Sequence, residues 1–151
     1  MAEAISHEVG PSVDGRPSRP EGGELLASIS RRIVQLLARH AGKGPTKCKT
    51  HWAGPDTLVV VLGGGYTEAE RTLFERGRAE DVRAYRTAIQ DALSEDMTAE
   101  VEELTARSVV AFMSTSHQDP DLLVEIFVLE PLDTTADIQS IAGGDGAPSA
   151  A

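Results

Sequence analysis

Hydrophobic residues in the first half of the chain recur first at a helical period and then at a strand period. Between residues 24 and 41 they form one stripe at helical spacing, which predicts an amphipathic helix. The stripe consists of Leu25, Leu26, Ile29, Ile33, Leu36 and Leu37. Gly42 suits the C-terminal cap of this helix, and Pro45 prevents its continuation.

Two strands follow the helix. Residues 46–52 alternate between a basic face, which we expect in solvent, and a face that we expect to pack. The basic face consists of Lys47, Lys49 and His51, and the packed face of Cys48, Thr50 and Trp52. After a turn at 53–56, the strand at 57–62 is apolar at every position from Leu58 onward, which predicts a central strand or one covered on both faces.

Glycines mark the connection to the second half of the chain. Three of them, at 63–65, end the strand. Thr67, with Glu70 three residues later, carries the signature of a capping box, in which each side chain binds a backbone N–H of the other residue. A helix therefore begins here, and we expect Gly77 to break it.

A longer helix and a second hairpin complete the pattern. The apolar stripe of this helix consists of Val82, Tyr85, Ile89, Leu93, Met97, Val101 and Leu104. Strands are predicted at 108–114 and 122–129, around a turn that Pro120 fixes. The order α-β-β-α-α-β-β predicts an α+β fold, a two-layer α/β sandwich in which helices cover one face of a four-stranded sheet.

The predicted domain spans residues 24–131 and is long enough for a hydrophobic core. The segments 1–23 and 132–151 are rich in Gly, Pro, Ser, Ala and acidic residues, so we expect both to be disordered tails. Because a small sheet leaves an edge or a face to cover, we expect a homodimer.

Composition narrows the function classes. The net charge of −10 argues against nucleic-acid binding. The sequence contains no run of about 18 apolar residues, the length needed to span a membrane. Its N-terminus lacks the features of a secretory signal. Cys48, the one cysteine, allows neither an internal disulfide nor a cysteine-based zinc site, which agrees with a cytoplasmic location. We therefore expect a cytoplasmic protein, at most peripheral to a membrane.

Charge is unevenly distributed along the chain. Residues 25–55 contain six basic residues and no acidic ones, whereas residues 91–137 contain twelve acidic residues and one basic residue. The best candidate for an interaction surface is a basic strip of Arg39, Lys43, Lys47, Lys49 and His51. Two interpretations stay open, a solvated surface or docking onto a second copy or another anionic partner.

Few residues suggest catalysis or metal binding. Gly42-Lys43 does not match a phosphate-binding loop, because the required glycine and hydroxyl residue are missing and the lysine follows a helix. Scattered histidines predict no metal site, no cofactor site is recognisable, and Cys48 reads as a packed residue. The acidic pair Glu68 and Glu70 is explained by a helix N-terminus, and nothing indicates the burial that acid–base catalysis requires. We therefore predict no catalytic residues.

One small-ligand hypothesis remains. Backbone N–H groups at the N-terminus of a helix after a glycine-rich turn can bind an anion. Gly64, Gly65 and Thr67 form such a corner here. A small-molecule or anion-binding sensor that uses the Gly63–Thr67 corner is thus the alternative function.

Taken in order, several segments resemble the MpsC-like domain family, which is named for a sodium-translocating, membrane-potential-generating system of bacteria. The similar segments are Gly42-Lys43-Gly44-Pro45, the strand at 57–62, Thr67-Glu68-Ala69-Glu70 and residues 119–129. The resemblance covers about residues 24–130. It implies a non-enzymatic, soluble accessory or regulatory protein beside a cation- or bicarbonate-linked transport protein, and it carries over no catalytic residues.

Overall fold

The computed structural model of the protein describes residues 21–132. The tails predicted at 1–23 and 132–151 lie almost wholly outside the described residues. The order of elements is α-β-β-α-α-β-β, as predicted. The helices are α1 (Gly22–Ala41), α2 (Glu68–Glu75) and α3 (Ala79–Thr105), and the strands are β1 (Lys47–Trp52), β2 (Thr57–Gly63), β3 (Val109–His117) and β4 (Leu122–Leu129).

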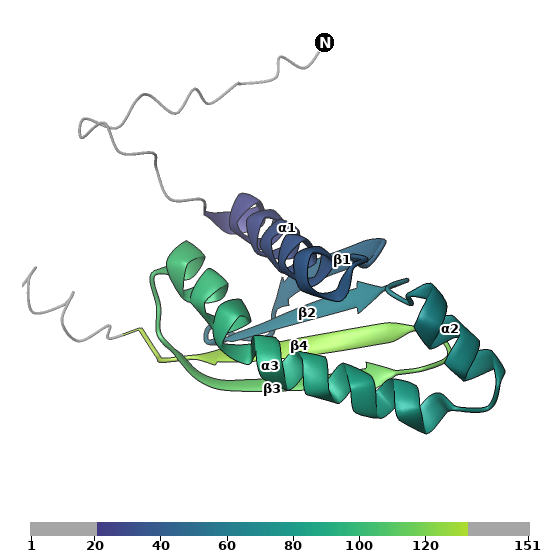
Figure 1. Ribbon diagram of the computed structural model, residues 1–151. Coiled ribbons are helices and arrows are strands. Elements are labelled where there is room, and N and C mark those ends of the chain that lie inside the picture. The colour runs from purple at the N-terminus through teal and green to yellow at the C-terminus, as the bar shows by residue number, and fades with distance from the viewer. Residues whose placement is uncertain (1–20, 133–151) are drawn as a thin grey trace, which may run out of the picture.

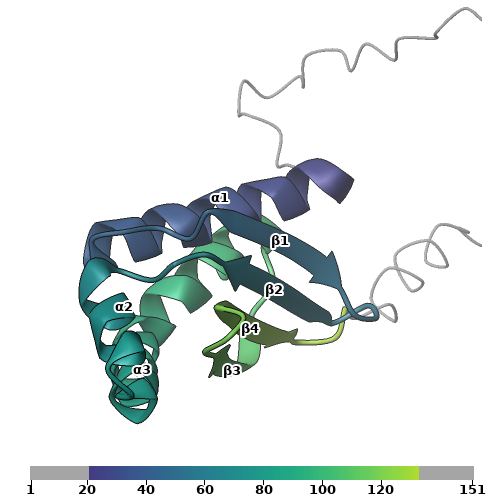
Figure 2. The ribbon, with the colours of Figure 1, turned by 90° about the vertical axis from the view of Figure 1, so that its right-hand side faces the viewer.

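The four strands form one antiparallel sheet in the order β1-β2-β4-β3. All three helices lie on the same side of this sheet, and no described helix lies on the other side (Figures 1 and 2). The predicted α+β class is thus confirmed. The apolar sequence of β2 predicted either a central strand or a strand covered on both faces. β2 is a central strand, and helices cover only one of its faces.

The local signals for the element ends are confirmed closely. Gly42 caps α1 in the left-handed conformation, with φ of 80°. Both hydrogen bonds of the capping box between Thr67 and Glu70 are present. Gly77 separates α2 from α3 with φ of 75°, which a residue with a side chain rarely adopts. α1 begins two residues before the predicted start, and β3 extends three residues beyond its predicted end, to His117.

The core lies between α1, α3 and the sheet. It is built from apolar residues of every element except α2, including Ile29 and Ile33 of α1 and Phe127 of β4, each of which has no exposed surface. The prediction that Trp52 packs was wrong. Its side chain is 36% exposed at the end of β1, where the guanidinium of Arg107 lies 5.8 Å from its ring.

The predicted apolar stripe of α3 was wrong at Tyr85, whereas Val82 is buried as predicted. Tyr85 is 43% exposed and Ile89 is half-buried, whereas Arg86 and Gln90 are buried. The reason is that buried carboxylates from other elements provide hydrogen-bonding partners for both polar side chains. In two turns of α3, the inward-facing position is thus held by a polar residue and not by the hydrophobic residue next to it.

Candidate functional site

The structure brings three of the five residues of the basic strip onto one surface. Lys47, Lys49 and His51 are exposed on the face of β1 that points away from the helices, as the alternation predicted. Arg39 is exposed in the last turn of α1, in the helix layer. Lys43, in the connecting loop, donates a hydrogen bond of 3.0 Å from Nζ to the carbonyl oxygen of Tyr66.

The charges of the basic strip are not neutralised by the described part of the chain. No carboxylate between residues 21 and 132 forms an ion pair with any of its five residues. Arg32 differs, because it binds Glu100 of α3 at 2.7 Å and so joins the basic and acidic halves of the chain. Lys47 and Lys49, beside His51, therefore remain open positive charges on one face of β1 of an acidic protein.

The glycine-rich corner carries carboxylates of its own chain. The backbone N–H of Tyr66 donates to Asp121 Oδ2 at 2.9 Å, and that of Thr67 donates to Glu70 Oε2 at 2.8 Å. Gly64 has a φ of 70°, which a residue with a side chain rarely adopts, and a Cβ there would clash with Thr46 Oγ1 unless the Thr46 side chain moved. An external anion at this corner would have to compete with both carboxylates.

A buried ionic cluster holds the corner together. Arg86 of α3 is 5% exposed, and it binds Glu70 Oε1 through Nε at 2.8 Å and Asp121 Oδ1 through Nη1 at 2.6 Å. Its guanidinium also lies 4.4 Å from the ring centre of Tyr66. Burial alone would lower the pKa of Arg86, but the two carboxylates raise it above its ordinary value, so the guanidinium stays charged. Glu70 is thus buried, at 5% exposure, although nothing in the sequence indicated it.

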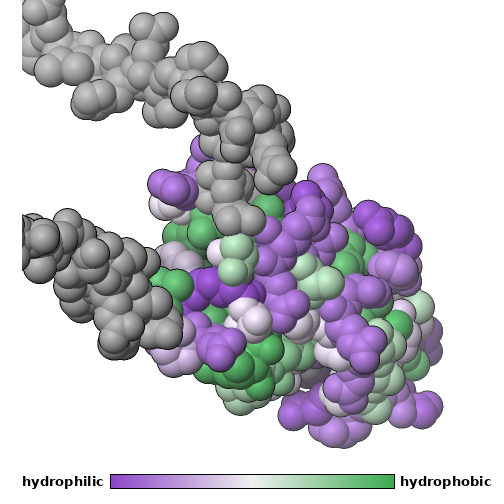
Figure 3. Space-filling model, turned by 90° about the vertical axis from the view of Figure 1, so that its left-hand side faces the viewer, coloured by the Kyte–Doolittle hydropathy of each residue, from purple (hydrophilic) through white to green (hydrophobic). Residues whose placement is uncertain are grey.

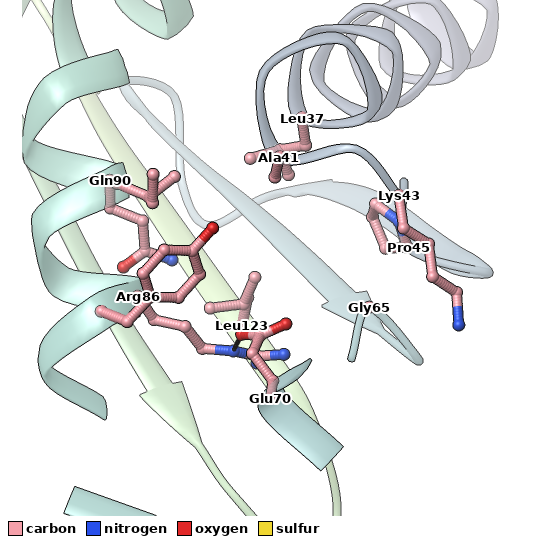
Figure 4. A pocket seen from close by; sticks show the side chains of 11 residues that line it. Leu37, Ala41, Lys43, Pro45, Gly65, Glu70, Arg86, Gln90 and Leu123 are labelled. Carbon is pink, nitrogen blue, oxygen red and sulfur yellow. Dashed lines mark hydrogen bonds and ion pairs between the residues drawn. The ribbon is translucent and has the colours of Figure 1, made fainter. Parts of the chain in front are cut away.

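A cleft lies above this cluster, between the C-terminal end of α1 and the N-terminal half of α3. Its cavity volume is only about 40 Å³. Figure 4 shows Leu37 and Ala41 of α1 opposite Arg86 and Gln90 of α3, with Leu123 and Glu70 below them and Lys43 at the rim. The only charged groups of its inner wall, Arg86 and Glu70, are already paired with each other.

Glu125 of β4 is the most deeply buried ionisable group described. Its side chain has no exposed surface, and its Oε1 accepts a hydrogen bond from Gln90 Nε2 at 3.1 Å. Glu125 Oε2 and the facing Ser114 Oγ are buried without a hydrogen-bond partner. Burial raises the pKa of Glu125 to about 7, and the nearby Ser114 hydroxyl lowers this pKa by a smaller amount. This acid therefore titrates near neutral pH.

The sequence interpretation missed these polar residues, although two signals were available. Arg86 and Gln90 fit the three- and four-residue spacing of Val82, Leu93 and Met97 as well as Tyr85 and Ile89 do. Glu125 falls in the same alternation phase as the core residues Leu123, Phe127 and Leu129. No signal in the sequence indicated the pairing of Glu70 with Arg86.

Potential metal ligands and nucleophiles are scattered between residues 21 and 132. Within the described range, no group of three or more His, Cys, Asp or Glu side chains could hold a metal ion. Burial raises the pKa of the Cys48 thiol, which disfavours the reactive thiolate. The side of the molecule in Figure 3 shows hydrophobic residues in small groups bordered by hydrophilic ones, so no extended apolar patch appears there.

Comparisons with known proteins give a family. No described helix is long and apolar enough to cross a membrane. Searches of the curated proteins and of the solved structures found no match. The family model described as "Na+-translocating membrane potential-generating system (MpsC)" matches residues 21–131, which is nearly the whole described fold. This chain therefore belongs to the MpsC family.

Proposed function

We propose that this protein is a non-enzymatic accessory component of a sodium-translocating, membrane-potential-generating system. In this proposal it acts from the cytoplasmic side of the membrane by binding an acidic surface of another component through the basic strip. The family description supports the link to the system. The observation that carries the binding role is that the five exposed residues of the strip form no ion pair within residues 21–132.

Electrostatics favours this use of the strip. Complementary charge at the rim of an interface raises the rate of association and selects the partner. Lys47 and Lys49 project from an edge strand, where lysine also discourages pairing with unrelated strands. A basic region on a chain with a net charge of −10 attracts an acidic partner while the rest of the surface repels it. The strip therefore determines the orientation of docking.

The test is a double charge reversal, Lys47→Glu with Lys49→Glu, in a cell that lacks its own copy of the gene. We expect the wild-type chain to restore membrane potential and sodium-dependent growth, and the variant to restore neither. The reason is that reversed charges repel the acidic surface. Membrane potential is measured with a voltage-sensitive dye during growth at low and high sodium.

A matched control combines Arg71→Glu on α2 with Arg76→Glu at the C-cap of α2, which changes the net charge equally at two other exposed positions. The control variant should complement like the wild type. Complementation by the Lys47→Glu, Lys49→Glu variant would contradict the role of the strip. Deletion of the gene without any change in membrane potential or sodium-dependent growth would contradict the accessory function itself.

The alternative is a sensor that binds an anion at Gly64, Gly65 and Thr67. It predicts that phosphate, sulfate or a nucleotide raises the melting temperature of the full chain in a thermal-shift experiment, because a ligand that binds only the folded state stabilises it. Thr67→Val removes the hydroxyl at the corner and should abolish such a shift. Thr87→Val is the control, because it removes an exposed hydroxyl of α3 that only donates to the carbonyl oxygen of Arg83. No shift with any of the three ligands would exclude this alternative.

A further inference from the structure

The sheet face opposite the helices is unusually apolar. This surface, called the open face below, carries alternate residues of all four strands. Its apolar members are Val59, Val61, Ala111, Met113, Leu122, Val124, Ile126 and Val128. Met113 is 51% exposed, and the valines and the isoleucine of β2 and β4 are half-buried by their neighbours alone. Figures 1 and 2 show no described helix over it.

This composition is that of a covered surface. A sheet with one face in water normally alternates apolar and polar residues. β2 and β4 instead carry mainly valine, leucine and isoleucine on both faces, and their polar residues are Thr57 and Glu125, of which Glu125 points into the core. Apolar surface of this extent marks an interaction site on a protein that is otherwise polar outside.

We infer that the open face packs against the open face of a second copy of this chain, forming a two-sheet sandwich about a two-fold axis parallel to the strands. The axis runs between β2 and β4, so that β2 of one protomer lies over β4 of its partner. Facing sheets in such sandwiches lie about 10 Å apart, with interdigitating side chains. The apolar residues of β2 and β4 form the centre of this interface.

The distribution of charge selects this axis. On the open face, β1 carries Lys47, Lys49 and His51, and β3 carries Thr115 and His117 with no lysine, arginine or carboxylate. The proposed axis places β1 of each protomer opposite β3 of its partner, so the lysines do not face one another. A two-fold axis perpendicular to the strands would place β1 against β1 and bring four lysines together, which like-charge repulsion disfavours.

The size of the face agrees with a dimer of moderate affinity. Four strands spaced about 4.8 Å apart, with about seven residues each at about 3.3 Å, give a planar footprint of roughly 450 Å². A standard interface takes about 800 Å² of accessible surface from each partner. The dimer should therefore dissociate on dilution. Because β1 is an edge strand, its lysines can extend past the interface, and the dimer would display one basic strip at each side.

The experiment is sedimentation equilibrium of the full chain over a wide range of concentrations, for the wild type and for Ile126→Lys and Ile126→Glu. The wild type should pass from monomer to dimer with increasing concentration, and its melting temperature should rise in parallel. Both variants should fail to dimerise. Each protomer contributes one charged residue 126, so the interface would bury two like charges near its centre. Circular dichroism establishes that each variant is folded.

Ala88→Lys, at an exposed position of α3, is the matched control and should still form dimers. A wild-type chain that is monomeric at every concentration would overturn the inference and leave the open face to another partner. Dimers of both Ile126 variants would also overturn it, because the contact would then lie elsewhere. Neither outcome bears on the charge-reversal experiment, which reads membrane potential and leaves Ile126 unchanged.

Discussion

Replacing Arg86 by methionine is expected to destabilise the fold by about 3 to 5 kcal/mol, the usual cost of removing one partner of a buried ion pair. The variant leaves the carboxylates of Glu70 and Asp121 without their cation, and their side chains are only 7% and 13% exposed. It also removes the guanidinium that lies against Tyr66. Urea denaturation followed by circular dichroism measures the loss as a change in the free energy of unfolding.

A matched control separates this effect from a general cost of losing an arginine on α3. Arg83 is 54% exposed and lies 3.9 Å from Glu80, so Arg83→Met should change stability by less than about 0.5 kcal/mol. Adding Glu70→Gln and Asp121→Asn to Arg86→Met should recover part of the loss, because neutral amides need no cation. An Arg86→Met variant as stable as the wild type would show that the cluster contributes nothing to the fold.

The second large expected effect is a dependence of stability on pH that Glu125→Gln removes. The pKa of Glu125 rises from 4.5 to about 7 on folding. Between these values the folded state retains a proton that the unfolded state has released. The stability of the wild type should therefore fall as the pH rises from 4.5 to 7 and then level off, by about 3 kcal/mol in total for this group.

Glutamine cannot ionise, so the variant should lack this contribution. We expect wild type and Glu125→Gln to be similarly stable at pH 4 and the variant to be more stable at pH 8. Its amide can still accept the hydrogen bond from Gln90 and can donate one to Ser114. Urea denaturation at several pH values provides the measurement, with the exposed Glu130→Gln as control. Parallel stability profiles for wild type and Glu125→Gln would contradict a buried acid that titrates near neutral pH.

Local chemistry made much of the fold predictable. The ends of α1 and α2 follow from single residues, namely the left-handed Gly42 and the reciprocal hydrogen bonds of Thr67 and Glu70. Strand faces follow from a period of two, which placed Lys47 and Lys49 correctly in solvent. Such signals act within a few residues, so a sequence displays them directly.

The polar interior was not predictable in the same way. The carboxylate of Glu70 accepts hydrogen bonds from the backbone N–H of Thr67, at the start of its own helix, and from the distant Arg86. Only the contact with Arg86 buries it. Asp121 joins the same cluster from the turn between β3 and β4, 35 residues after Arg86. No periodicity relates these positions, because they meet only when α2, α3 and the second hairpin have packed together.

The sequence by itself thus determined the element order, the fold class, the family resemblance and the exposed basic strand, since each depends on local spacing. Tertiary structure alone decided which polar residues enter the core, because burial of a charge depends on partners from other elements. It also decided that no described helix covers the second face of β2 and β4. Their apolar sequence requires only that both faces be shielded from water, and the packing of the helices determines which face a single chain leaves open.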